Sequence, residues 1–209
     1  LDVYEEEEEY FFEDFSQENI EAWMSYNREV LDEIEANLPD MGVDQRINAR
    51  LLRSEILSEL DKWDQEATHK NSPGFYSNAI SRAVPRILYT DLLMRGEKVN
   101  LIMQRLAGIQ EMCTAGQEML ENGSPENTQR SVNSLKKSAD FIGNSLFEII
   151  EGWLGEHNPD EVKAVCEAAA EAIQGFASYI EEEILPKASI SDSPILGRDK
   201  FAQMLKIYT

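Results

Sequence analysis

The stretch VNSLKKSADFIGNSLFEIIEGW, residues 132–153, decides the fold class of this 209-residue chain. Its apolar side chains recur at alternating intervals of three and four residues, the spacing of a helix that packs lengthwise against other helices in a bundle. We therefore expect one long helix here, with its apolar side chains in a single buried seam. The expected seam consists of Val132, Leu135, Ala139, Ile142, Leu146, Ile149 and Trp153.

The residues on both sides of this stretch show helical periodicity as well. Apolar spacings predict helices over about residues 16–38, 43–65, 75–94 and 102–120 before it, and over about residues 159–186 after it. No stretch alternates apolar and polar residues for long enough to indicate a strand. The sequence therefore predicts an all-α fold, a bundle of about six long amphipathic helices with short connections.

Local signals refine these helices. Ser16 is the expected N-cap of the first helix, and Pro159 is expected near the first helical position of the last. Pro85 lies inside the third helix, where the missing N–H group predicts a kink or a break. The second helix is expected to bury one apolar side, made of Ile47, Leu51, Leu52, Ile56, Leu60 and Trp63.

The start of the chain differs in composition from the rest. Residues 1–15 hold eight acidic side chains and no basic one, and aromatic residues stand among the acids. Such a run of like charges is typical of a solvated tail. We expect an acidic, partly disordered tail over residues 1–15, whose aromatic end packs on the body, and a single helical domain over residues 16–209.

The charge of the chain excludes some functions. It has 40 acidic and 19 basic residues and a net charge of −21. Nucleic acid is therefore not expected as a partner, because phosphate binding needs a concentrated basic surface. No stretch approaches the ~18 apolar residues of a membrane-spanning helix. No signal segment is visible at Leu1, and we expect a cytoplasmic location.

Residues with catalytic or metal-binding chemistry are few. His69 and His157 lie in polar stretches and are expected to be exposed loop residues. Cys113 and Cys166 fall on or beside apolar stripes and are expected to be core thiols. There is no His-Glu-x-x-His or Cys-x-x-Cys motif, and neither histidine follows a glutamate by three residues. No catalytic residue, cofactor or metal site is predicted in this chain.

The scarce basic residues are the candidate contact residues. Arg46, Arg50 and Arg53 have the spacing of one helix face, and Arg86 and Arg105 belong to a second concentration of basic residues in the middle of the chain. They either pair with the acidic helices around them or form a cationic patch that faces an anionic group or another domain. The sequence leaves both alternatives open.

A series of landmarks in a fixed order resembles the N-terminal part of the bacterial domain of unknown function family 885. The resemblance extends over nearly the whole chain from about residue 14. One departure is Gln110, where the family usually has a proline. The landmarks are Leu51 and Leu52, Pro73 and Tyr76, Arg95, Arg105, Leu106 and Ile109, the helix end at Leu185 and Pro186, and Leu196, Gly197, Phe201 and Leu205.

This resemblance implies a role inside a longer polypeptide. Complete members of the family resemble zinc-dependent peptidases of gluzincin-like helical architecture, and their His-Glu-x-x-Pro-Gly-His-His motif lies downstream of the region matched here. This chain has no such segment, so the resemblance assigns it no catalytic residue. Zinc is implied only for a full-length protein that includes the downstream motif. It implies a non-catalytic N-terminal helical domain that forms one wall of a substrate cleft. The alternative is a stand-alone helical adaptor or scaffold that binds a basic partner through its acidic surface.

Overall fold

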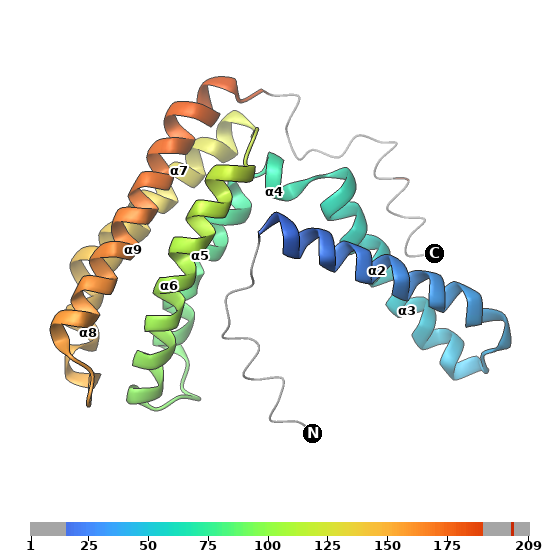
Figure 1. Ribbon diagram of the computed structural model, residues 1–209, viewed down its shortest axis with the longest axis horizontal. Helices are drawn as coiled ribbons and strands as arrows, with labels where there is room; N and C mark the ends of the chain where they lie inside the picture. Colours follow the sequence, from blue (N-terminus) through green and yellow to red (C-terminus); the bar gives the residue numbers. More distant parts are fainter. Residues whose placement is uncertain (1–15, 190–201, 203–209) are drawn as a thin grey trace.

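The computed structural model describes residues 16–189 and Ala202, and every regular element among them is helical (Figure 1). A hairpin of two helices, α2 (Gln17–Asn37) and α3 (Val43–Leu60), projects from one end of a bundle. The four long helices of the bundle are α5 (Pro73–Tyr89), α6 (Arg95–Met119), α7 (Pro125–Asp140) and α9 (Pro159–Tyr179). The predicted all-α bundle is confirmed.

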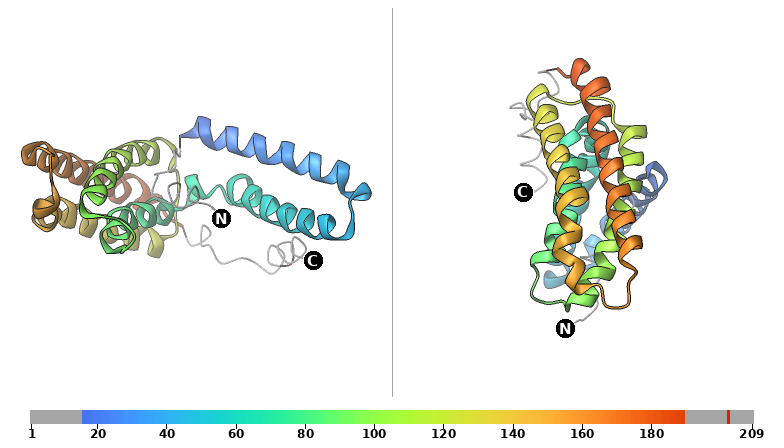
Figure 2. Two further views of the ribbon diagram at one scale, coloured as in Figure 1. Left: turned by 90° about the horizontal axis from the view of Figure 1, so that it is seen from below. Right: turned by 90° about the vertical axis from the view of Figure 1, so that its left-hand side faces the viewer.

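The hairpin is held by a small core of its own. Ser16 caps α2 as predicted, because its Oγ accepts a hydrogen bond from the N–H of Asn19 at 3.4 Å. A 3₁₀ turn (Leu38–Asp40) follows α2, and α3 then returns alongside it (Figure 2, left). Between the two helices lies a small apolar cluster built on Ile34, Ala49 and Ile56.

The prediction of which apolar side chains of α3 are buried is wrong for three residues. Ile47, Leu51 and Leu52 are 54, 64 and 49% exposed, whereas Ile56 is buried. The physical reason is that, of the described helices, α3 has only α2 along its length, so one narrow stripe is covered. Ile47 and Leu51 lie on the side of α3 that faces away from α2.

A short neck joins the hairpin to the bundle. It consists of a π-helical turn (Asp61–Gln65) and the single-turn helix α4 (Thr68–Asn71). Between them Ala67 has a left-handed backbone (φ 44°) and stands directly before the first residue of α4. Trp63 is buried as predicted and packs in a cluster with Ile20 of α2 and Met119 of α6.

The bundle holds the main core, between four helices that run side by side (Figure 2, right). Pro159 occupies the first turn of α9 as predicted. Pro85 lies inside α5 without ending it, and α5 stops at Tyr89, short of the expected end near residue 94. Among the described residues, the hydrophobic ones buried to 0% exposure are Tyr76, Val84, Val99, Ile102, Leu106, Ile109, Val132, Leu135, Leu146, Ile150, Ala169, Ile173, Phe176, Ala177 and Ile180.

The seam of residues 132–153 changes register halfway. Five of its seven predicted members, Val132 to Leu146, are buried, but Ile149 is 44% exposed and Trp153 is only half-buried. Ile150 and Leu154 take their places. A π-helical stretch (Phe141–Leu146) precedes α8 (Phe147–Ile150), and its wider turns shift the buried positions by one residue.

Candidate interaction surfaces

The three arginines predicted on one face of α3 have different local roles. Arg46 donates to the carbonyl oxygens of Pro39 at 3.3 Å and Met41 at 3.0 Å, and so fixes the hairpin turn. Arg53 pairs with Glu35 of α2 at 3.1 Å, which ties the two helices together. Arg50 is exposed and makes no ion pair with any residue that the structure describes.

The other two predicted arginines lie in the bundle. Arg86 is exposed on α5, whereas Arg105 on α6 is only 9% exposed. The structure therefore places the five candidate arginines in two separate parts of the fold. A common anion site for all five is not formed within residues 16–189.

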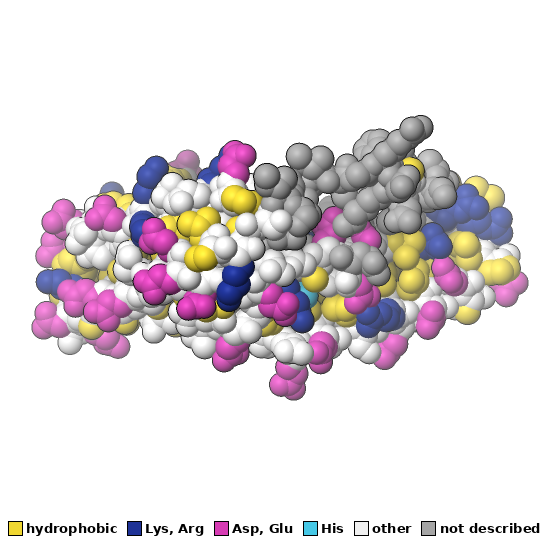
Figure 3. Space-filling view, turned by 90° about the horizontal axis from the view of Figure 1, so that it is seen from above, with side chains coloured by type: hydrophobic (Ala, Val, Ile, Leu, Met, Phe, Trp, Pro, Cys, Tyr) yellow, Lys and Arg dark blue, Asp and Glu magenta, His cyan; other side chains and the backbone are white. Residues whose placement is uncertain are grey.

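An exposed apolar stripe runs along α3, and we call it the outer α3 face. It consists of Val43, Ile47 and Leu51, which are 76, 54 and 64% exposed and follow one another at intervals of one helical turn. Arg50 lies on its flank. Figure 3 shows hydrophobic side chains at the surface of the hairpin with basic and acidic ones beside them.

A second exposed apolar surface lies at the opposite end of the bundle from the neck, in the connection from α5 to α6. We call it the bundle tip. It consists of Tyr89, Leu92 and Met94, which are 82, 73 and 72% exposed. The backbone around it is held in place, because the Nζ of the buried Lys98 donates to the carbonyl oxygen of Leu88 at 3.0 Å.

Charged groups surround the bundle tip. The N–H of Met94 donates to Glu97 at 2.8 Å, which closes the first turn of α6. The guanidinium of Arg95 lies over the ring of Trp153, 5.6 Å from its centroid. Arg86 lies about one helical turn before Tyr89 on α5. The apolar spacing predicts residues 90–94 inside a helix, so this surface is not expected from the sequence.

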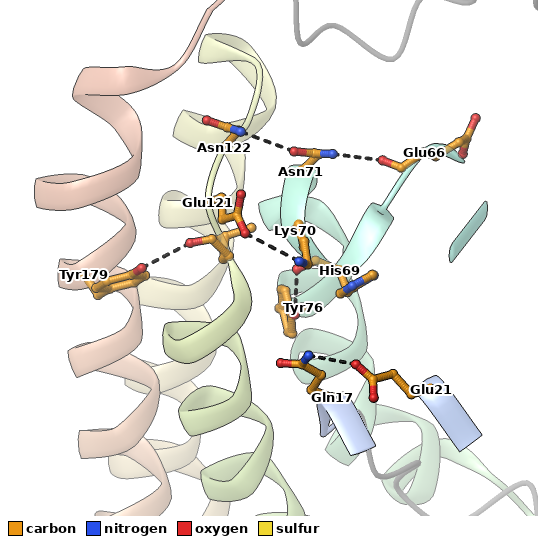
Figure 4. A network of polar contacts seen from close by, with 11 residues as sticks. Gln17, Glu21, Glu66, His69, Lys70, Asn71, Tyr76, Glu121, Asn122 and Tyr179 are labelled. Carbon is orange, nitrogen blue, oxygen red and sulfur yellow. Dashed lines mark hydrogen bonds and ion pairs between the residues drawn. The ribbon is translucent and has the colours of Figure 1, made fainter. Parts of the chain in front are cut away.

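Polar contacts in the neck connect α4 to the end of α6 (Figure 4). The carbonyl oxygen of Lys70 accepts hydrogen bonds from the N–H groups of Glu121 at 2.8 Å and Asn122 at 3.0 Å. The side chains of Lys70 and Glu121 also form an ion pair at 3.6 Å. The hydroxyl of the fully buried Tyr76 donates to the carbonyl oxygen of His69 at 2.7 Å.

His69 is buried, and the expectation of an exposed loop residue is wrong. It is 7% exposed, and its ring lies 5.5 Å from that of Trp63. The short helix α4 packs between the π-helical turn and the end of α6, so the side chain of His69 lies inside the neck. Desolvation lowers the pKa of His69, and the nearby Lys70 lowers it further. Its Nδ1 has no hydrogen-bond partner among the described residues.

The remaining candidate residues have ordinary structural roles. His157 is half-buried, and its Nε2 lies 2.8 Å from Oδ1 of Asn100. Cys113 and Cys166 are buried free thiols, as predicted, and burial raises their pKa values to about 12 and about 11. In the part of the chain that is described, no three His, Cys, Asp or Glu side chains are grouped so that they could hold a metal ion.

Comparisons with known proteins give one match. A family model with the description "Bacterial protein of unknown function (DUF885)" matches residues 5–209. No curated protein and no solved structure matches the chain. Within the described residues, no helix is both long enough and apolar enough to cross a membrane.

Proposed function

The chain belongs to the bacterial protein family of unknown function DUF885, and on that premise we propose that it is the non-catalytic N-terminal helical domain of a longer polypeptide. In that polypeptide, which resembles a zinc metallopeptidase, the domain forms one wall of a substrate cleft. Its part in the reaction is to bind and position a peptide, while the reacting groups and the zinc belong to the downstream region.

The bundle tip carries this proposal. Tyr89, Leu92 and Met94 are each more than 70% exposed, and they are grouped within six consecutive residues of the chain. Burying one such side chain is worth about 1.5–3 kcal/mol, so an apolar group of this kind on a surface marks a contact site. Arg86 and Arg95 provide a basic rim for the acidic or carbonyl groups of whatever covers it.

The test compares the 209-residue chain with a version extended through the downstream region. The short chain is expected to bind no stoichiometric zinc and to hydrolyse no peptide, and the extended version to do both. In the extended version Leu92→Asp should lower kcat/KM or weaken the docking of the two parts. Ile149→Asp, at another exposed apolar position on the bundle, is the control and should change neither.

Two results would overturn the proposal. One is stoichiometric zinc binding with peptide hydrolysis by the 209-residue chain alone. The other is an extended protein in which Leu92→Asp behaves like Ile149→Asp. Tight binding of a basic protein by the short chain, unaffected at Leu92, would instead favour the stand-alone adaptor that binds through its acidic surface.

A further inference from the structure

The neck has a buried histidine at the place where the hairpin meets the bundle. We propose that the neck is a pH-sensitive joint, in which protonation of His69 releases Trp63 and lets the hairpin turn about Glu66 and Ala67. The hairpin and the bundle each stay folded while the joint opens. This inference concerns the neck alone and does not depend on the bundle tip or on the proposed function.

Contacts within the neck divide it into two parts. The π-helical turn is held to the hairpin, because Asp64 forms an ion pair with Arg28 of α2. The short helix α4 is held to the bundle, because the carbonyl oxygen of Lys70 accepts two N–H groups at the end of α6. The boundary therefore lies at Glu66 and Ala67. The left-handed backbone of Ala67 is a conformation that a residue other than glycine adopts only at a cost, so the strain favours opening.

The side chain of Trp63 spans this boundary. Its indole N–H donates to Glu59 of α3 at 3.0 Å, which ties it to the hairpin. Its ring lies 5.5 Å from the ring of His69 on α4 and 5.6 Å from that of Phe75 on α5. The same cluster includes Met119 of α6. Packing of Trp63 therefore aligns the hairpin with the bundle.

The site of the His69 ring suits the neutral form. The side chain is 7% exposed, and its Nδ1 has no hydrogen-bond partner among the described residues. A second proton on the ring would bury a positive charge without an acceptor, which is unfavourable until the ring reaches water. The ring reaches water by leaving Trp63, so proton uptake and opening of the joint are coupled.

The charged groups on the bundle side of the joint do not compensate an imidazolium at His69. Lys70 lies next to it on α4 and lowers its pKa, whereas Glu121 raises that pKa by less. Glu121 is also engaged already, since it pairs with Lys70 at 3.6 Å (Figure 4). Tyr76 of α5 donates to the carbonyl oxygen of His69 and stays neutral, because burial raises its pKa.

The acidic groups on the hairpin side have partners as well. Glu59 pairs with Lys62 at 3.6 Å, and Asp64 pairs with Arg28. Glu21 of α2 accepts a hydrogen bond from Gln17 at 2.8 Å. An imidazolium in the closed joint would therefore have to take a carboxylate from another partner.

The pH range of the opening follows from these contacts. Opening solvates His69 and returns its pKa to about 6.5, whereas desolvation keeps the pKa lower in the closed joint. The ratio of open to closed molecules should therefore rise by up to about tenfold for each pH unit between these two pKa values. The joint is expected to be closed above pH 7 and to open as the pH falls below about 6.5.

The experiment measures the distance between a spin label on the hairpin and one on the bundle of the full chain, by pulsed electron paramagnetic resonance. Cysteines are introduced at exposed positions by Asn48→Cys on α3 and Gln104→Cys on α6, while Cys113 and Cys166 are buried and stay unlabelled. At pH 8 the distances should form one narrow distribution. Toward pH 5 a second, broader population should grow, and a return to pH 8 should remove it.

Variants separate His69 from the other groups that titrate. His69→Gln and His69→Phe cannot take up a proton, and in both the distances should no longer change between pH 8 and pH 5. His157→Gln removes the other histidine of the chain and should leave the response intact. A second label pair inside the bundle, at Gln104→Cys and Gln174→Cys, should keep one constant distance.

Three outcomes would overturn the proposal. The first is a distance distribution between positions 48 and 104 that is the same at pH 8 and pH 5. The second is a pH response that His69→Gln and His69→Phe leave as large as in the parent chain. The third is an equal change in the label pair inside the bundle, because acid then loosens the whole protein and not the joint.

Discussion

Replacing Gly116 by alanine tests how tightly α6 packs against Phe176 of α9. A Cβ atom at this position would lie 2.5 Å from Cζ of Phe176 and 3.2 Å from Cδ1 of Tyr76. Carbon atoms in contact prefer about 3.5–4.0 Å. Both rings are fully buried and pack edge to face at 5.7 Å, so neither can swing into solvent. Overpacking of this kind costs about 1–3 kcal/mol.

Gly175→Ala provides a matched control on α9. Gly175 is exposed, and a Cβ there meets nothing within 4 Å, so the higher helix propensity of alanine should stabilise the protein by about 0.5–1 kcal/mol. Most of this propensity gain also applies to Gly116→Ala and cancels in the comparison. The two variants should therefore differ by about 1–3 kcal/mol in the free energy of unfolding.

The assay is urea unfolding followed by helical circular dichroism, with thermal unfolding beside it. A loss of 1 kcal/mol lowers Tm by about 2–4 °C in a protein of this size. Phe176→Leu in the Gly116→Ala background should recover part of the loss, because it removes the ring atoms that the new methyl group meets. The reasoning is refuted if Gly116→Ala stabilises the protein as much as Gly175→Ala does.

Three further predictions concern buried polar groups. Tyr76→Phe should lower the free energy of unfolding in urea by about 1–2 kcal/mol, because it leaves the buried carbonyl oxygen of His69 without its donor. Tyr179→Phe removes a similar hydrogen bond at a half-exposed site and should cost less, and equal losses would contradict this reasoning. The pKa of His69 is lowered on folding, so its contribution to stability is present above the unfolded value of about 6.5 and is lost as the pH falls below it. Trp63 fluorescence should report this loosening, and His69→Gln should remove it; an unchanged acid transition would contradict the assignment. Burial raises the pKa of Cys113 to about 12, so stability should fall as the pH rises above about 9, and Cys113→Ala should flatten that part of the profile measured by thermal unfolding.

Much of the fold could be predicted because local signals and the apolar period agree. Ser16 and Pro159 mark helix starts that the structure confirms. The wrong predictions concern positions whose burial depends on how the helices pack against one another. Ile47 is apolar and in phase with the rest of its helix, but a two-helix hairpin can bury only one side. Ile149 follows a π-helical stretch, and no residue type in the sequence signals that extra residue.

The candidate surfaces could be predicted only in part. The spacing of Arg46, Arg50 and Arg53 correctly placed them on one helix, but whether each has a partner depends on α2 and on the hairpin turn. The bundle tip could not be predicted from the apolar period, because Leu88, Leu92 and Leu93 keep helical spacing although α5 ends at Tyr89. His69 could not be predicted to be buried, because α4 is too short to have a period of its own.

The unequal size of the two apolar cores has a consequence for cooperativity. The hairpin rests on a small cluster around Ile34, Ala49 and Ile56, whereas the bundle shares one continuous core across four helices. Local unfolding free energies follow the apolar contacts that an opening breaks. Amide hydrogens of α2 and α3 should therefore exchange through openings that leave α6 and α9 intact. The hairpin and the bundle would then be two foldons, and a ligand on the hairpin would stabilise one of them without changing the global unfolding of the other.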